Sequence, residues 1–416
     1  MPKKSAQLSV LCLLLTRKQA GTKRPRCSII LPMSYLSGVS QDEVKNFHAD
    51  IHARWQTPEC ILKPLLDQWG YEDSVIGDRI VAGESSEVYK LYEGSTGDLL
   101  GYLRIAHHEL NYAEVVLMEE CTYAGLPSVQ VLRYGAYDCV QNGSSNRISI
   151  TLLSPAEGIN IEEGLDAGEL ESEVAQKAIS NAGKELARIH RLSETSNSIA
   201  DLVEREHDIF SRRKPSDYFS ECLKGLEDIP GLEEFLQRVA RNIEMLDVKF
   251  GEIIDNHPLV LTHADYDMKH LYCDPQTGEI TSIIDFGEAH VSVSHADLVH
   301  WNTYSTESYP FFLEGYLGER FSVGSMHEGV FLNELDVAFA ERVFLDELDV
   351  VFAVGQLKWA AGRVENGINA EAIHHLMKCV ETCEGLSVGY PNLAVISLKN
   401  YQAIGSDTTF RTNLYL

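Results

Sequence analysis

Apolar residues change their spacing along this chain, and the change separates a sheet-forming part from a helical part. Helical spacing, with a capping-box pattern at its start, predicts a helix over 41–55 and a second over 58–69. Over 79–153 the apolar residues form short runs rich in Val, Ile, Tyr and Leu, with turn residues at 94–97 in a hairpin position. This pattern predicts an antiparallel sheet, interrupted by one helix over 112–124.

Beyond Gly158 the apolar spacing becomes mainly helical. Helices are expected over 169–191, 201–209 and 232–250, and short strands over 130–134, 148–153, 258–261, 271–274 and 280–284. The fold class is therefore α+β, with a small antiparallel β-rich lobe in front of a larger helical lobe. The expected divisions are a tail over 1–39, a helical extension over 40–74, the β-rich lobe over 75–153, the helical lobe over 154–390 and a tail over 391–416.

The charge is distributed unevenly. The chain carries 35 Lys and Arg against 62 Asp and Glu, a net charge of −27, and 44% of its residues are hydrophobic. Residues 1–32 hold seven of the basic residues and no acidic one, which leaves 28 basic and 62 acidic residues in the remainder. This hydrophobic content excludes a collagen-like or disordered chain, and the acidic body argues against nucleic acid and favours a cationic partner. Solubility is an alternative explanation of the charge.

The cysteines and the N-terminus bear on the cell compartment. Nine dispersed cysteines indicate buried thiols rather than a disulfide framework, which suits a reducing compartment. The apolar run Leu8–Leu15 is far shorter than the ~20 residues that span a bilayer, so no membrane span is expected. A cytoplasmic protein is predicted. Alternatives for the basic N-terminus are a mitochondrial presequence, a disordered tail, or a gene start at Met33.

One segment repeats. The eleven residues 330–340 recur as 343–353 with nine identities. A continuous helix would rotate the second copy by ~220° relative to the first, so the two copies could not bury the same stripe. We therefore expect a local duplication in which one copy bulges out or breaks the helix.

The residues that carry chemistry lie between Leu259 and Trp301. One apolar strand ends in His263-Ala264-Asp265, and a second, after a hairpin, ends in Asp285-Phe286-Gly287. Two carboxylates at the ends of buried strands, twenty residues apart with a hairpin between them, can converge on one point. Asp265 could then accept a hydroxyl proton while Asp285 holds magnesium, which are two tasks of phosphoryl transfer.

These residues resemble the aminoglycoside phosphotransferase family, the protein-kinase-like small-molecule kinases. His263, Asp265, Asp285 and Gly287 match its catalytic pattern, and Ala264 replaces the usual Gly. His270 stands where the family usually has a metal-binding Asn, and macrolide- and hygromycin-type phosphotransferases resemble this chain in carrying His at that place. The resemblance implies a protein-kinase-like two-lobe fold, catalytic roles for Asp265 and His263, and His270 and Asp285 as ligands of Mg²⁺, although magnesium prefers oxygen to nitrogen. For His263 the alternative is a fold-holding residue that hydrogen-bonds near the base.

The resemblance covers about residues 75–365 and also implies a nucleotide site. A glycine-serine loop would cover the phosphates, an arginine paired with an acid would hold them, and the interlobe hinge would bind the base. The residues implied are Gly83, Ser85, Ser86, Arg104, Glu114, Leu153 and Ser154. His190 and Asp297 are expected to be structural, with Asp297 bracing the catalytic loop, and Lys269 is expected to be an exposed loop residue that could reach the phosphate.

The expected function is transfer of the γ-phosphoryl group of ATP or GTP to a hydroxyl of an aminoglycoside-, macrolide- or amino-alcohol-like acceptor. A cationic acceptor would suit acids in the helical region, unless they form a solvated face: Glu334, Asp336, Asp346, Glu347 and Asp349. The alternative is a catalytically inactive kinase-like binding module in which His270 no longer supports metal. The acceptor, the choice between ATP and GTP and the oligomeric state stay open.

Overall fold

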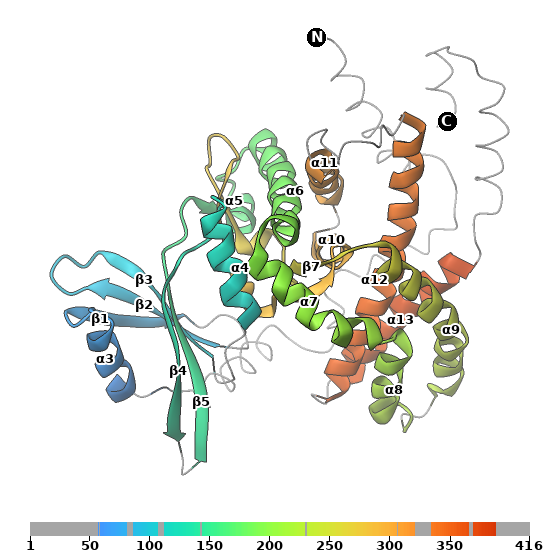
Figure 1. Cartoon of the computed structure of the whole chain (residues 1–416), viewed down its shortest axis with the longest axis horizontal. Coiled ribbons are helices and arrows are strands. Elements are labelled where there is room, and N and C mark those ends of the chain that lie inside the picture. The colour runs from blue at the N-terminus through green and yellow to red at the C-terminus, as the bar shows by residue number, and fades with distance from the viewer. Residues whose placement is uncertain are drawn as a thin grey trace, which may run out of the picture.

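A computed structural model describes residues 57, 59–80, 86–106, 112–141, 144–228, 231–305, 307–320, 334–365 and 369–387. The expected helix over 41–55, the two tails and the predicted phosphate-loop residues Gly83 and Ser85 lie outside these ranges. The described part is α+β, with an antiparallel sheet at one end of the molecule and helices at the other (Figure 1). The expected fold class is confirmed.

The sheet has the strand order β1-β2-β3-β5-β4, and every neighbouring pair is antiparallel. Its strands are β1 (Ser74–Ile80), β2 (Ser86–Glu93), β3 (Leu99–Ala106), β4 (Val131–Gln141) and β5 (Ser144–Leu153). The predicted hairpin turn lies between β2 and β3, where Gly97 has a φ of 76° that favours glycine. Helix α3 (Glu59–Gln68) packs Leu62 and Leu66 on the sheet residues Leu91 and Leu103 (Figure 1).

Helix α4 (Tyr112–Tyr123) joins the two lobes. Its buried residues Leu117 and Met118 belong to the hydrophobic core of the helical lobe, and it lies between the sheet and α7 in Figure 1. Gly125, with a φ of 68°, ends the helix as predicted. Because α4 packs between the sheet and the helical lobe, it fixes the residues at its two ends relative to both lobes.

The remaining elements form the helical lobe and two small sheets. The helices are α5 (Ile161–Asp166), α6 (Ser172–Thr195), α7 (Asn197–Arg212), α8 (Pro215–Leu226), α9 (Glu233–Asn256), α10 (His295–Tyr304), α11 (Tyr309–Arg320), α12 (Glu334–Glu365) and α13 (Asn369–Ser387). The strands are β6 (Ile159–Asn160), β7 (Leu259–Thr262), β8 (Leu271–Cys273), β9 (Ile280–Ile283) and β10 (His290–Val293), with 3₁₀ turns η2 (Met268–His270) and η3 (Phe286–Glu288). β10 pairs with β7, and β8 pairs with β6 and β9.

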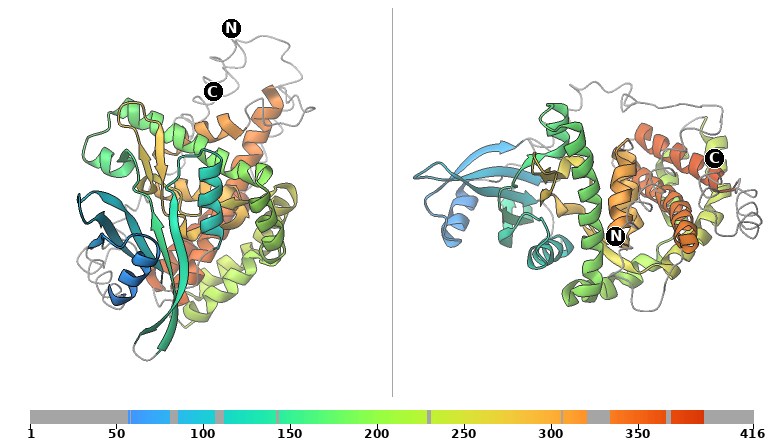
Figure 2. Two further views of the ribbon diagram at one scale, coloured as in Figure 1. Left: turned by 60° about the vertical axis from the view of Figure 1, so that its left-hand side comes forward. Right: turned by 90° about the horizontal axis from the view of Figure 1, so that it is seen from above.

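Two helices of this lobe, α6 and α11, pack closely against each other. α6 and α11 lie side by side in both views of Figure 2. A Cβ on Gly183 of α6 would collide with the carbonyl oxygen of Phe312, and one on Gly315 of α11 would collide with that of Ser180. The two glycines therefore let the helix backbones approach each other closely.

Helix α8 and strand β10 are among the elements that the sequence did not predict. α8 begins with Pro215 at its first turn and buries Tyr218, Phe219 and Cys222, a helical spacing that was present in the sequence. β10 is only four residues long, and it forms a strand because β7 pairs with it. β4 and β5 also extend well beyond the expected 130–134 and 148–153.

The expected break in the repeated segment is wrong over the described residues 334–353. α12 runs continuously from Glu334 to Glu365, so it includes residues 334–340 of the first copy and all of the second copy. The second copy buries Leu348, Val350, Val351 and Ala353, in a helix that packs against α8, α9, α10 and α13. Packing of this buried face against these four helices stabilises the continuous helix.

None of the helices in the ranges given above combines the length and the apolar composition required to cross a membrane.

Candidate active site

The two predicted carboxylates meet at the ends of their strands. Asp265 follows β7, and Asp285 follows β9 with a left-handed φ of 60°. The ligand atoms of Asp265, His270 and Asp285 all lie within 4.8 Å of one another. His270 ends the 3₁₀ turn that begins after Asp267, whose carboxylate accepts a hydrogen bond from the Lys269 N–H at 3.0 Å. The local turn therefore carries His270 back toward Asp265.

His270 presents a defined nitrogen to Asp285. Its Nδ1 lies 2.7 Å from the carbonyl oxygen of Asp265, which can only accept, so Nδ1 carries the hydrogen. Its Nε2 then has the lone pair and lies 3.5 Å from Oδ2 of Asp285. The His270 side chain is 10% exposed and that of Asp285 is 46% exposed. His270 and Asp285 thus present one imidazole nitrogen and one carboxylate toward solvent, as candidate metal ligands.

Asp265 is held by positively charged or protonatable groups. Nε2 of His300 lies 3.0 Å from its Oδ1, and Nζ of Lys269 lies 3.4 Å from the same atom. Burial acts to raise the pKa of Asp265, but the hydrogen bond with His300 and the positive charge of Lys269 outweigh it and hold the pKa well below its usual range. Asp265 therefore stays ionised at neutral pH.

The turn over residues 263–270, which we call the catalytic turn after the family pattern it resembles, contains a strained residue. Ala264, which replaces the family's glycine, has a φ of 69°, a region that costs a residue with a Cβ ~1–2 kcal/mol. The carboxylate of Asp297 holds the turn, because it accepts hydrogen bonds from the N–H of Ala264 at 2.6 Å and of His263 at 3.0 Å. Nε2 of the fully buried His190 lies 2.9 Å from the same carboxylate. The expected structural roles of Asp297 and His190 agree with these contacts.

His263 is completely buried, which bears on its predicted catalytic role. Its Nε2–H donates to the carbonyl oxygen of Ile284 at 3.0 Å, and its Nδ1 accepts from the N–H of Asp265 at 3.3 Å. Burial lowers the pKa of His263, which favours this neutral form. The ring therefore ties Asp265 to the residue before Asp285, and we assign it a positioning role instead of contact with substrate.

Arg104 and Glu114 form the pair that the resemblance implies. Nη1 of Arg104 is hydrogen-bonded to Oε1 of Glu114, and its Nη2 lies 3.9 Å from Oδ1 of Asp285. Burial raises the pKa of Glu114 although Arg104 opposes this. Nε of Arg104 donates to Oγ of Ser86 at 3.3 Å. A Cβ at Gly287 would collide with Nη2 of Arg104, so glycine after Asp285 leaves room for the guanidinium.

The hinge residues differ from expectation in one respect. The N–H of Ser154 donates to the carbonyl oxygen of Gln130 at 2.9 Å, and its hydroxyl accepts from the N–H of Gln130 at 2.9 Å. The N–H and the hydroxyl of Ser154 thus connect the end of β5 to the segment before β4. The Ser154 N–H is therefore not available to bind the base of a nucleotide. Leu153 pairs with Tyr102 and Val131, which fixes the hinge to the sheet.

Two residues of the site were missed. His300 lies on α10 three residues after Asp297, so helical spacing puts both on the side that faces the catalytic turn. That spacing was visible in the sequence. Asn160 donates from Nδ2 to the carbonyl oxygen of Lys269 at 2.7 Å. No sequence pattern indicated this contact, because 109 residues separate the two.

A His300→Gln substitution is expected to destabilise the protein more at low pH than at high pH. Burial acts to lower the pKa of His300, but hydrogen bonds to Asp265 and Asp267 outweigh it and raise the pKa. The charged ring therefore contributes fully below the unfolded value of ~6.5, and the contribution is lost as pH rises through the folded pKa. Hydrogen bonds to charged groups contribute about 1.5–3 kcal/mol, and we expect a difference of this order at low pH.

Urea unfolding of the wild type and the variant on both sides of the raised pKa measures this difference. His374→Gln is a suitable control, because it removes a histidine outside the candidate active site. The His374 ring lies against that of His375, with 5.8 Å between centroids. An equal loss of stability at both pH values in His300→Gln would show that the ring is not charged in the folded state.

Several solved structures resemble this chain at low sequence identity. A thermostable mutant of aminoglycoside phosphotransferase APH(4)-Ia is 15% identical, with 77% of this chain and 97% of that chain covered and a TM-score of 0.47. The GDP complex of aminoglycoside 2'-phosphotransferase-IIIa is 14% identical, with 79% and 99% covered and a TM-score of 0.49. An ethanolamine kinase of Plasmodium vivax is 12% identical, with 77% and 84% covered and a TM-score of 0.47. No curated protein matches the chain.

A family profile covers more than half of the chain. The profile of the phosphotransferase enzyme family, abbreviated APH, matches residues 79–328. The matched range begins in β1, includes Arg104, Glu114 and the turn from His263 to Asp285, and extends past α11. The members of this family transfer phosphoryl groups to hydroxyl groups. This chain belongs to the phosphotransferase enzyme family, and it is an enzyme of the kinase type.

Proposed function

We propose that this chain transfers the γ-phosphoryl group of ATP or GTP to a hydroxyl group of a small, cationic acceptor. The observation that carries the proposal is the convergence of Asp265, His270 and Asp285 within 4.8 Å, with the guanidinium of Arg104 beside Asp285. Phosphoryl transfer depends mainly on positioning and on electrostatic stabilisation of the transferred group. A carboxylate for the acceptor, a metal-binding pair and a phosphate-binding arginine are the groups it requires.

Asp285 and His270 would hold Mg²⁺. The donor set fits this ion moderately well, since Asp285 offers an exposed carboxylate and His270 offers the lone pair of Nε2 where an oxygen would suit magnesium better. When bound, the ion neutralises charge on the phosphate oxygens. Arg104 would contact the phosphates from the other side of Asp285, and Glu114 fixes its direction.

Asp265 would orient the acceptor hydroxyl. Its lowered pKa makes it a weak proton acceptor in the ground state, and a loose transition state places little demand on a base. The carboxylate remains able to accept a hydrogen bond from the hydroxyl and to take the proton late in the transfer. Lys269, whose side chain is 44% exposed and which lies beside Asp265, is placed to meet the transferred group.

The acceptor is proposed to be cationic because the chain carries a net charge of −27. The acids of α12 were expected to suit a cationic acceptor. One of them, Glu347, contacts His257 and His295 instead. Asp349 is exposed, and the side chains of Glu334, Asp336 and Asp346 lie outside the described part. Aminoglycoside-, macrolide- and amino-alcohol-like acceptors all remain within the proposal. The inactive binding module gains no support, because the candidate groups converge and His270 keeps a lone pair toward Asp285.

Nucleotide consumption across an acceptor panel tests the proposal. Purified protein with Mg²⁺ and either ATP or GTP would be assayed against aminoglycosides, macrolides, choline and ethanolamine, with phosphorylated product identified by mass. We expect turnover with one acceptor class above the background hydrolysis, and none in Asp285→Ala. Nucleotide binding that is independent of magnesium, without turnover of any acceptor, would favour the inactive binding module instead.

A further inference from the structure

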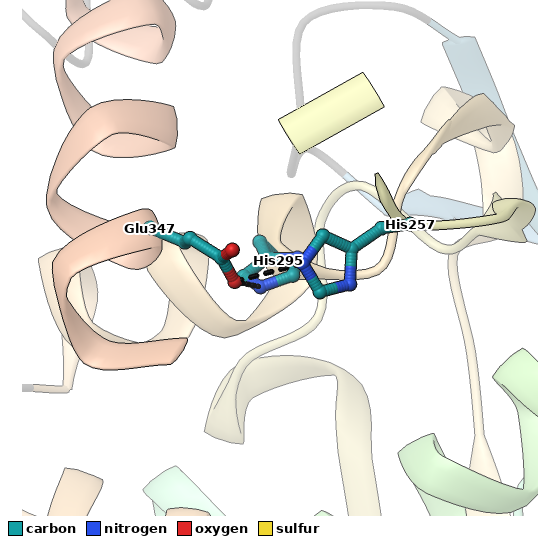
Figure 3. A group of neighbouring side chains, drawn as sticks. All are labelled: His257, His295 and Glu347. Carbon is teal, nitrogen blue, oxygen red and sulfur yellow. Dashed lines mark ion pairs between the residues drawn. The ribbon is translucent and has the colours of Figure 1, made fainter. Parts of the chain in front are cut away.

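A second group of metal-ligating side chains lies away from the candidate active site. His257, His295 and Glu347 bring their ligand atoms within 4.8 Å of one another (Figure 3). Among the described residues two other groups of this kind occur, and both include Asp265, so they belong to the candidate active site. This third group, which we call the His-His-Glu cluster, takes no part in the proposed phosphoryl transfer.

The cluster joins three elements that are distant in sequence. His257 follows the last residue of α9, and its extended backbone, with φ −118° and ψ 137°, is the conformation that the following Pro258 favours. His295 is the first residue of α10, and Glu347 lies in α12. In Figure 3 the two imidazole rings and the carboxylate point toward one another from these separate elements.

The distances suit a shared cation. Nε2 of His257 lies 2.8 Å from Oε2 of Glu347, and Nε2 of His295 lies 3.3 Å from the same oxygen. Ligands at the usual zinc distances of about 2.0–2.2 Å in a tetrahedron are separated by about 3.3 Å. The ring centroids are 4.8 Å apart and the ring planes meet at 73°, so the two nitrogens reach Glu347 from different directions. A small expansion of the cluster would accommodate the ion.

Burial and charge support the same conclusion. The His295 side chain is fully buried, while those of His257 and Glu347 are 29% and 18% exposed, which provides an entry path and room for a water as a fourth ligand. Burial lowers the pKa of His295 and keeps the ring neutral, as a metal ligand must be. Burial acts to raise the pKa of Glu347, but hydrogen bonds with His257 and His295 outweigh it and hold the pKa at about 2.

The geometry points to a site for a divalent transition-metal ion of the zinc class, held by His257, His295 and Glu347. Two imidazole nitrogens disfavour magnesium and calcium, which prefer oxygen ligands. The ion would cross-link the end of α9, the start of α10 and α12. Because α10 also carries Asp297 and His300, the cross-link stabilises the helix that braces the catalytic turn.

Zinc titration of chelator-treated full-length protein tests this site. We expect tight uptake of one zinc ion in competition with a coloured chelator, and a rise of at least about 3 °C in Tm that magnesium does not reproduce. His257→Gln and Glu347→Gln should each weaken binding by at least about 100-fold, since loss of an outer-shell partner alone costs 10–100-fold. His374→Gln and Asp255→Asn, which remove a histidine and an exposed carboxylate outside the cluster, should bind zinc as the wild type does.

Two further measurements do not depend on whether the cluster variants fold. Asp285→Asn, which alters the candidate active site, should keep the tight zinc site. X-ray absorption of zinc-loaded wild type should show two imidazole ligands, because the group of Asp265, His270 and Asp285 contains only one histidine. A single imidazole, loss of zinc uptake in Asp285→Asn, or unchanged uptake in both cluster variants would overturn the assignment. None of these results depends on whether the chain phosphorylates an acceptor.

Discussion

Asp265→Asn is expected to lower kcat by ~10²–10⁴ while nucleotide affinity stays nearly unchanged. Asn has the size of Asp and can keep a hydrogen bond with His300, so the local structure should hold. It lacks the negative charge that orients the acceptor hydroxyl and that would take its proton. Arg104 and Glu114 do not touch Asp265 in the contacts described above, which is why nucleotide binding should survive the substitution.

Steady-state kinetics and nucleotide titration by calorimetry measure the two effects separately. Asp274→Asn is a matched control, because Asp274 lies in the exposed turn between β8 and β9, where its carboxylate accepts hydrogen bonds from the N–H groups of Gln276 and Thr277. It should leave kcat within a small factor of the wild type. A parallel loss of nucleotide affinity and kcat in Asp265→Asn would mean that Asp265 binds the nucleotide or its metal.

Asp285→Ala is expected to abolish the magnesium-linked part of nucleotide binding and to lower kcat/KM by ~10³ or more. A bound metal ion contributes several kcal/mol of charge stabilisation, and each 1.36 kcal/mol corresponds to a factor of ten in rate. Asp285 is also the exposed carboxylate beside Arg104, so its loss leaves that guanidinium without its second acidic neighbour.

His270→Asn provides the contrast for this prediction. Asn supplies an oxygen ligand in place of Nε2, which suits magnesium better, so the variant should keep activity with Mg²⁺. Manganese should favour the wild type relative to this variant, because imidazole suits softer metals. Both variants would be compared by nucleotide titration with and without each metal. Magnesium-linked binding that persists in Asp285→Ala, or a fully inactive His270→Asn, would contradict the assigned metal pair.

Local patterns were sufficient to predict much of the catalytic centre. Asp265 and Asp285 each follow a short apolar run, and these runs become the strands β7, paired with β10, and β9, paired with β8, whose ends lie close together. The helix over 112–124 was also predicted, with Gly125 as its end, and Glu114 lies on its first turn, where it is hydrogen-bonded to Arg104 of β3. In these cases the residues that determine the geometry are near one another in the chain.

The same reasoning failed where the backbone conformation or a partner was set from a distance. The sequence shows Ala264 in place of the family's glycine, but only the structure shows that its φ of 69° is strained and depends on Asp297, 33 residues later. The break expected in the repeated segment does not occur, because four other helices pack against α12. The hinge was expected to offer backbone groups to the base, and the structure shows that the N–H of Ser154 donates to the carbonyl oxygen of Gln130.

By itself the sequence determined the α+β class, the order of the lobes and the two converging carboxylates, and the family resemblance implied the pair of Arg104 and Glu114. Only the tertiary structure decided that His300 holds Asp265, that His263 is buried, and that His257, His295 and Glu347 meet. The physical reason is that strand ends and helix faces follow from neighbouring residues, whereas the approach of α9, α10 and α12 depends on how complete helices pack their side chains together.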